Sequence, residues 1–116
     1  MSQADLTLTE SEDVNRIILQ GRLDSAGVAA VEIKFNAGAV ASGKPAIVDL
    51  SGVTFIASLG IRMLITASKR MAQAGRPLVL LSPQELVDES LKAIDLYRLI
   101  PVAFSEREAL DQIAGA

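Results

Sequence analysis

Ser58 is the residue of this chain best placed to take part in chemistry. It follows a short apolar run, Ala46–Leu50, and a helical pattern begins directly after it. This order predicts Ser58 at the carboxyl end of a buried strand, beside the positive end of a helix, where ligands and regulatory groups often bind in α/β folds. We expect it to cap the helix by accepting a backbone hydrogen bond. An exposed hydroxyl there is also open to phosphorylation, and Arg62, four residues on, is positioned to pair with the phosphate.

Ser58 lacks the partners that a catalytic serine needs. The chain contains no His and no Cys, which removes an imidazole base, thiol nucleophiles and the usual zinc ligands. The residues around Ser58 do not form the G-x-S-x-G motif of hydrolases, and no glycine-rich phosphate-binding loop occurs. We therefore expect a protein that is not an enzyme and that has no metal site and no cofactor.

Asp24 is the second candidate, because it also stands between an apolar run and a helical pattern. Its residue type predicts a helix cap or a turn. Loops that follow parallel strands gather at one edge of a sheet, so Asp24 is expected at the same edge as Ser58. Asp49 and Ser51 are expected to form hydrogen bonds in a turn around Gly52.

The composition predicts one domain over residues 1–116, with a core from about 6 to 113. Of the 116 residues, 50% are hydrophobic and 3% are aromatic, so aliphatic side chains must form the core. The net charge is −3 and the basic residues are scattered, which argues against nucleic-acid binding. We expect a cytoplasmic protein without membrane insertion, since no long apolar run and no signal-peptide pattern occurs at Met1–Asp5.

The periodicity of apolar residues predicts an α/β fold with a mostly parallel sheet and an N-terminal antiparallel hairpin. The expected strands are 6–10, 16–21, 46–50, 77–81 and 102–104. The expected helices are 26–40, 59–74, one that begins with a cap at Ser82, and a terminal one that begins with a capping box at Ser105–Glu108. Helices between successive strands imply right-handed crossovers.

Two segments of the chain resemble the signature of the STAS domain, named for sulphate transporters and anti-sigma factor antagonists. Residues Ile47–Val53, followed by Phe55–Ile56 and Ala57–Arg62, are similar to the family's strand, its Asp-Ser-Ser-Gly motif and the following helix. Upstream, Gly21–Asp24 looks like the family's Gly-x-Leu-Asp loop. The resemblance extends from about Leu6 to Ile113 and implies a STAS-like single domain.

The resemblance implies a bacterial signalling protein, an anti-sigma factor antagonist that regulates transcription by partner switching. The unphosphorylated form would bind an anti-sigma factor that is also a serine kinase, and phosphorylation at Ser58 would release it. A PP2C-type phosphatase, which is metal-dependent, would reset the protein. The implied partner-binding residues lie around the two motifs: Asp24, Ser25, Ile56, Ala57, Ser58, Leu59, Gly60 and Arg62.

Two residues differ from the family's motif, because Ala57 and Leu59 stand where Asp and the second Ser are found. This leaves alternatives open. In one alternative, the chain is a non-switching subunit of a larger assembly, such as a stress-signalling scaffold or a lipid-transport complex, and Ser58 is only a helix cap. A third hypothesis is nucleotide or small-ligand binding at the sheet edge, which the absence of a phosphate-binding loop disfavours. The oligomeric state, the sigma factor and the stimulus are not encoded in any recognisable pattern.

Overall fold

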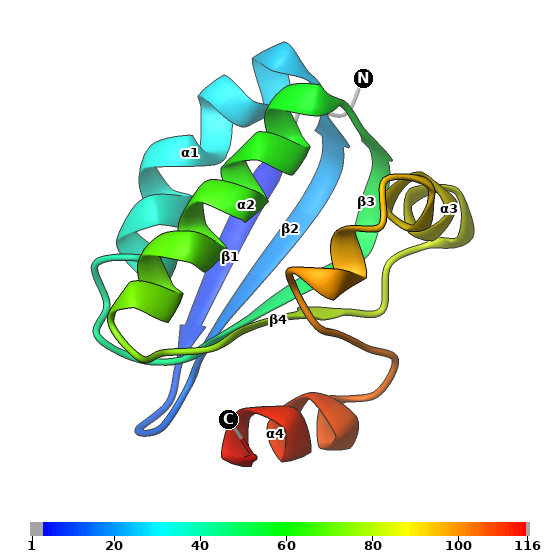
Figure 1. Cartoon of the computed structure of the whole chain (residues 1–116). Coiled ribbons are helices and arrows are strands. Elements are labelled where there is room, and N and C mark those ends of the chain that lie inside the picture. The colour runs from blue at the N-terminus through cyan, green and yellow to red at the C-terminus, as the bar shows by residue number, and fades with distance from the viewer. Residues whose placement is uncertain (1–3, 116) are drawn as a thin grey trace.

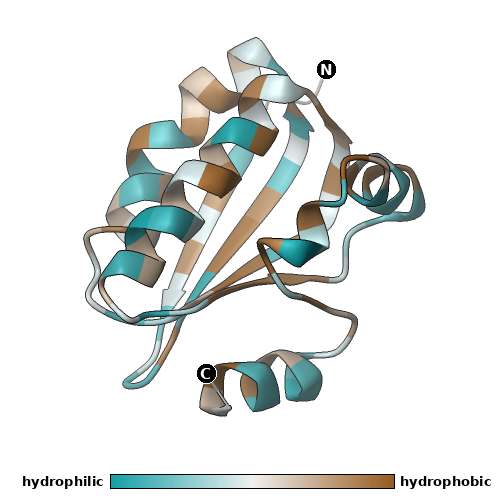
Figure 2. Cartoon of the chain, viewed as in Figure 1, coloured by the Kyte–Doolittle hydropathy of each residue, from teal (hydrophilic) through white to brown (hydrophobic). Residues whose placement is uncertain are grey.

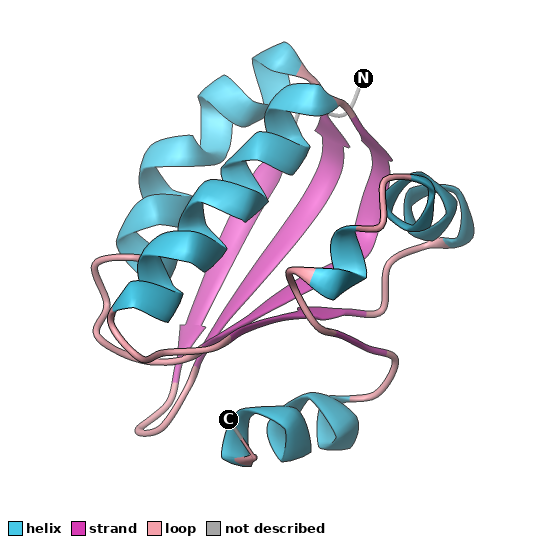
Figure 3. Ribbon diagram, in the orientation of Figure 1, coloured by secondary structure: helices cyan, strands magenta, loops and turns pink. Residues whose placement is uncertain are grey.

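The computed structural model describes residues 4–115 and confirms the predicted order of elements (Figure 1). The strands are β1 Asp5–Glu10, β2 Asn15–Leu23, β3 Ala46–Ile56, β4 Leu78–Leu81 and β5 Val102–Ala103. The helices are α1 Ser25–Ala39, α2 Ser58–Gln73, α3 Glu85–Ala93 and α4 Glu106–Ala114, with a short 3-10 helix, η1, at Leu96–Arg98. The strands form one five-stranded sheet in the order β1-β2-β3-β4-β5. Only β1 and β2 are antiparallel, so the predicted fold class is correct (Figure 3).

The sheet separates two hydrophobic cores of unequal size. Helices α1 and α2 cover one face of the sheet and α4 lies against the other (Figure 1). The larger core lies beneath α1 and α2, and its largest fully buried side chains include Ile17, Leu19, Phe35, Leu50 and Leu64. The smaller core lies beneath α4 and contains Val14, Ile47, Val79, Ala103 and Ala109. Figure 2 shows brown, hydrophobic residues along the strands and teal and brown residues alternating in the helices, as amphipathic helices require.

The central strand β3 is longer than the sequence predicts. It continues through Ser51 and Gly52 to Ile56, where a loop was expected. The register against β2 shifts between Ile18 and Gln20, so a β-bulge accommodates the polar residues. Gly52 suits this position, because a Cβ atom would lie 2.8 Å from Cγ of Gln20 and 3.3 Å from the Leu19 carbonyl oxygen. The Ser51 amide does donate to the Asp49 carboxylate, at 2.9 Å, but this hydrogen bond lies within the strand and the predicted turn is wrong.

The two predicted caps in the carboxyl-terminal half have different outcomes. Ser105 caps α4 and its hydroxyl accepts a hydrogen bond from the Glu108 amide at 3.1 Å, as predicted. The predicted cap at Ser82 is wrong, because α3 begins at Glu85 and its N-cap is Gln84. Ser82 instead adopts a left-handed conformation with φ of 50°. The Gln84 side chain turns away from α3 and donates to the Ser51 carbonyl at 2.6 Å.

Arg76 joins the end of α1 to the segment that follows α2. Its guanidinium donates to the carbonyl oxygens of Ala39, Val40 and Lys44, at 3.1, 2.7 and 3.0 Å. The last carbonyls of a helix have no partner within the helix. One side chain therefore satisfies several acceptors around the end of α1 and holds the amino end of β3 in place.

Candidate functional site

The carboxyl ends of β2 and β3 lie side by side and place Asp24 and Ser58 at one edge of the sheet. Leu23 pairs with Ile56 across the two strands, and the Ala57 amide donates to the Leu23 carbonyl at 2.9 Å. Helices α1 and α2 begin directly after these residues, so both N-termini open at the same edge (Figure 1). The sequence predicts this shared edge, and the backbone hydrogen bond is what secures it.

Ser58 is the first residue of α2, not its cap. The N-cap is Ala57, with φ −101° and ψ 177°, and no side chain caps the helix. The prediction that Ser58 is the cap is therefore wrong, because the helix begins one residue earlier than its apolar pattern suggests. Ser58 is exposed, and its hydroxyl has no hydrogen-bond partner among residues 4–115. The first amides of α2 thus lack a side-chain acceptor, and their partial positive charge is available to an added anion.

Asp24 is the cap of α1, as the sequence predicts. Its carboxylate accepts a hydrogen bond from the Gly27 amide at 2.8 Å, and Nε of Arg22 lies 3.5 Å from its other oxygen. The amide of Gly27, aided by the Arg22 guanidinium, lowers the pKa of Asp24 below its ordinary value. The N-terminus of α1 is therefore already occupied by a negative charge, whereas that of α2 is not.

Arg22 and Phe55 also belong to this edge, although their residue types alone do not predict it. They are paired neighbours on β2 and β3, and Cζ of Arg22 lies 4.3 Å from the centroid of the Phe55 ring. Phe55 is 39% exposed, so the ring stands at the surface. Arg22 lies in the Gly21–Asp24 motif, in which Gly21–Leu23 belong to β2 and not to the expected loop. Its aromatic partner becomes apparent only once the register between β2 and β3 is known.

The remaining predicted binding residues fall into an exposed group and a buried group. Leu59 is 42% exposed, and Ser25 and Arg62 are exposed as well. Together they line a hollow of about 320 Å³ between α1 and α2. Ile56 is only 6% exposed and Gly60 is buried, so neither presents a broad surface to a partner.

Gly60 allows α2 to approach β2 closely. A Cβ atom at this position would lie 2.9 Å from Cγ1 of Ile56 and 3.0 Å from both Cβ and the carbonyl oxygen of Leu23. Real Cβ atoms do not tolerate the shorter of these separations. Gly60, one of the implied partner-binding residues, thus makes its close approach to the chain's own strand.

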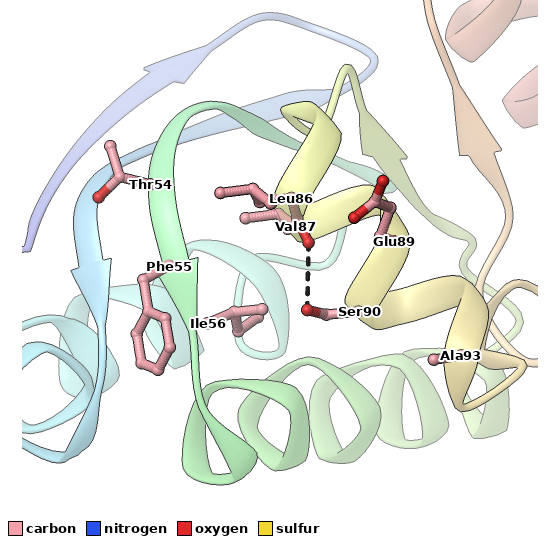
Figure 4. Close-up of a pocket in the computed structure, with 8 residues that line it drawn as sticks. All are labelled: Thr54, Phe55, Ile56, Leu86, Val87, Glu89, Ser90 and Ala93. Atoms are coloured by element: carbon pink, nitrogen blue, oxygen red, sulfur yellow. Dashed lines mark hydrogen bonds between the residues drawn. The ribbon is translucent and has the colours of Figure 1, made fainter.

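A second hollow of about 430 Å³ lies on the other side of the β3 end, against α3 (Figure 4). It is lined by Thr54, Phe55, Ile56, Leu86, Val87, Glu89, Ser90 and Ala93. Within the described part of the chain, no group of acidic residues is arranged to hold a metal ion. No helix of residues 4–115 combines the length and the apolar character that crossing a membrane requires.

Solved structures share this fold over nearly their whole length. An anti-sigma factor antagonist from Mycobacterium paratuberculosis is 18% identical with a TM-score of 0.86, and the alignment covers 97% of this chain and 95% of that one. A STAS domain protein from Planctomyces limnophilus is 24% identical, with a TM-score of 0.80 and coverage of 97% and 99%. The phosphorylated form of SpoIIAA, a cell fate determinant from Bacillus, is 20% identical, with a TM-score of 0.69 and coverage of 94% and 99%.

Sequence comparison gives the family directly. Curated proteins provide no match to this chain. The family model described as "Mlab, STAS domain" matches residues 6–101, which span both motifs and the sheet edge that they form. The chain therefore belongs to the STAS domain family.

Proposed function

We propose that this chain is an anti-sigma factor antagonist that acts by partner switching at Ser58. The unphosphorylated protein binds an anti-sigma serine kinase through the edge that carries Asp24, Ser25, Leu59 and Arg62. Phosphorylation of Ser58 releases the kinase, and a PP2C-type phosphatase restores the binding form. The chain itself is a cytoplasmic binding module without catalysis. Support comes from the family, from structural relatives described as anti-sigma factor antagonists, and from the geometry of Ser58.

The exposed and uncapped position of Ser58 is the observation that carries the proposal. A phosphate on its hydroxyl would lie beside amides of α2 that no side chain engages. A phosphoserine carries about −1.5 to −2 charges, which the positive end of a helix stabilises. Modification at this position therefore leaves the fold intact and changes only the charge of the surface.

The neighbouring Leu59 explains why the added charge would release a partner. A protein that covers this exposed leucine must also cover Ser58, its neighbour in the first turn of α2. Burying a phosphate against apolar surface costs its hydration unless the partner supplies matching positive charge. We expect affinity to fall at least about tenfold, or about 1.4 kcal/mol.

Ser25 offers a matched control for the phosphorylation experiment. It is the exposed first residue of α1, just as Ser58 is the exposed first residue of α2, but Asp24 already caps its helix. The protein is incubated with ATP and an anti-sigma factor serine kinase, and phosphate is counted by intact mass. We expect Ser58→Ala to abolish the added phosphate and Ser25→Ala to leave it unchanged. Phosphate at another residue, or none with an active kinase, contradicts the proposal.

The family description supports a second candidate function. STAS-like domains also occur in lipid-transport complexes, and the matching family model carries the name Mlab. In that role Leu59 would belong to a permanent contact, and Ser58 would have no regulatory task. The two functions differ in one measurement: a complex purified with this chain persists after kinase and ATP treatment if the contact is permanent, and dissociates if it switches.

A further inference from the structure

More than half of the central strand pairs with another described strand on one side only. Strand β3 pairs with β4 from Ala46 to Asp49, but its pairing with β2 continues to Ile56. Within residues 4–115, no strand lies beside the rest of β3 on the side of β4. A sheet edge of this kind presents backbone N–H and C=O groups to any extended chain that comes alongside.

One backbone group on this edge already accepts a substitute donor. The Ser51 carbonyl accepts a 2.6 Å hydrogen bond from the side-chain amide of Gln84. A carboxamide N–H is chemically close to the backbone amide that a paired strand would offer. The hydrogen bond shows that this carbonyl points toward the α3 side of the strand, where an added chain would lie.

An apolar hollow runs between this edge and α3. Its volume is about 430 Å³, and Ile56 and Val87 contribute buried apolar surface to it. Leu86 is 71% exposed and reaches from α3 toward β3 (Figure 4). An exposed leucine beside a half-open apolar hollow is typical of a surface that a partner side chain covers.

The rim of the hollow carries one acidic side chain. Glu89 projects from α3 at this rim, and no ion pair with another residue of the described chain engages it (Figure 4). Its neighbour on the helix, Asp88, is by contrast held by Lys92 at 3.1 Å and by the Tyr97 hydroxyl at 2.6 Å. A basic residue of the occupant would give Glu89 the partner that the chain does not supply.

We propose that the β3 edge and this hollow bind an extended peptide segment of a partner protein as an additional strand. The segment places an apolar side chain, such as Leu, Ile or Val, in the hollow. Two residues on, on the same face of the added strand, a Lys or Arg meets Glu89. Unpaired strand backbone favours an extended occupant over a helix, because a helix has no free amides or carbonyls along its length to offer. This site is distinct from the switch at Ser58 and does not depend on the function proposed above.

The test begins with a displayed library of random ten-residue peptides selected against the whole protein. We expect the recovered peptides to share the apolar-x-basic pattern. A recovered peptide is then synthesised in three forms: unmodified, and N-methylated at alternate residues in each of the two possible registers. A strand uses the amides of only one of its two edges to pair. One N-methylated form should therefore bind at least about tenfold more weakly, while the other binds like the unmodified peptide.

Charge reversal on α3 tests the assignment of Glu89 and has a matched control. Glu89→Lys should weaken the binding of the basic peptide about tenfold. It should strengthen the binding of a twin peptide in which Glu replaces the basic residue. Glu85→Lys makes the same change on the same helix outside the hollow, and should alter either affinity by less than about twofold. Backbone amide chemical shifts should move at 51–56. The proposal is overturned if the library yields no binder, if both N-methylated forms bind equally well, or if the shifted amides lie on another surface.

Discussion

The Arg22 guanidinium lies over the ring of Phe55, and its Nε also lies 3.5 Å from the Asp24 carboxylate. Arg22 therefore connects an exposed aromatic ring on β3 with the cap of α1. Both contacts lie at the surface, where solvent screens them. They therefore orient the Arg22 and Phe55 side chains more than they stabilise the fold. The ring is held at the edge that also carries Ser58.

The contact between Arg22 and Phe55 can be measured by a double-mutant cycle. We expect Arg22→Gln and Phe55→Leu to be coupled by about 0.5–1 kcal/mol in urea unfolding, which is typical of exposed cation–π pairs. Arg70→Gln is the control for Arg22, because Arg70 lies in the last turn of α2 at the opposite end of that helix. Strictly additive effects of Arg22→Gln and Phe55→Leu would show that the contact contributes nothing.

The charge of Asp24 should make stability depend on pH. The folded state lowers the pKa of Asp24 from its ordinary value of 3.8, so folding favours the ionised carboxylate. The stabilisation is present in full above pH 4 and is lost as the pH falls through the folded pKa. Asp24→Asn, which retains an oxygen for the Gly27 amide, should therefore be less stable than the wild type at pH 7, and the difference should be smaller at pH 2. A difference that stays constant in urea unfolding at both pH values would exclude a contribution from the charge.

Replacing Gly60 should cost stability through steric conflict. Gly60→Ala places a Cβ 2.9 Å from Cγ1 of Ile56 and 3.0 Å from the Leu23 carbonyl, so α2 must shift away from the strand. We expect a loss of about 1–3 kcal/mol in the free energy of unfolding. Gly115→Ala is the control, because the nearest atom to its Cβ would be 3.5 Å away, and it should be neutral within about 0.5 kcal/mol. Equal effects at both glycines would contradict the close approach.

Arg76, which is half-buried, should be more important to stability than exposed basic residues are. Arg76→Met keeps the aliphatic stem but leaves the carbonyls of Ala39, Val40 and Lys44 without this donor. Hydrogen bonds from charged groups contribute about 1.5–3 kcal/mol, so we expect a loss in that range on urea unfolding. Arg98→Met, at an exposed residue whose one ion pair is to Asp95, should cost less than about 1 kcal/mol. A loss no larger for Arg76→Met than for Arg98→Met would rule out the stabilising role.

The order of the elements could be predicted because each has its own local pattern. The alternation of β1 and β2 and the apolar faces of α2 and α4 need no knowledge of distant residues. The length of β3 could not be predicted in this way, since Ser51 and Gly52 are typical turn residues. They remain in the strand because the bulge opposite Leu19 accommodates them and because Gly52 leaves room for Gln20.

Only the part of the candidate site that depends on local residue type could be predicted. Asp24 has the residue type of a cap and proves to be one. At α2, by contrast, a poor capping residue, Ala57, holds the cap position, so residue preference pointed to Ser58 instead. The pair formed by Arg22 and Phe55 depends on the register between strands that are far apart in the sequence, and neither residue alone signals it.

The single-sided pairing of β3 also has a consequence for motion. Residues 46–49 pair with strands on both sides, whereas within residues 4–115 the end of β3 that leads to Ser58 pairs with no strand other than β2. Opening that end breaks fewer hydrogen bonds and exposes less core than opening the middle of the sheet. The amides of 53–56 should accordingly lose protection from hydrogen exchange well before those of 46–49. The segment that presents Ser58 can thus rearrange locally while the rest of the domain stays folded.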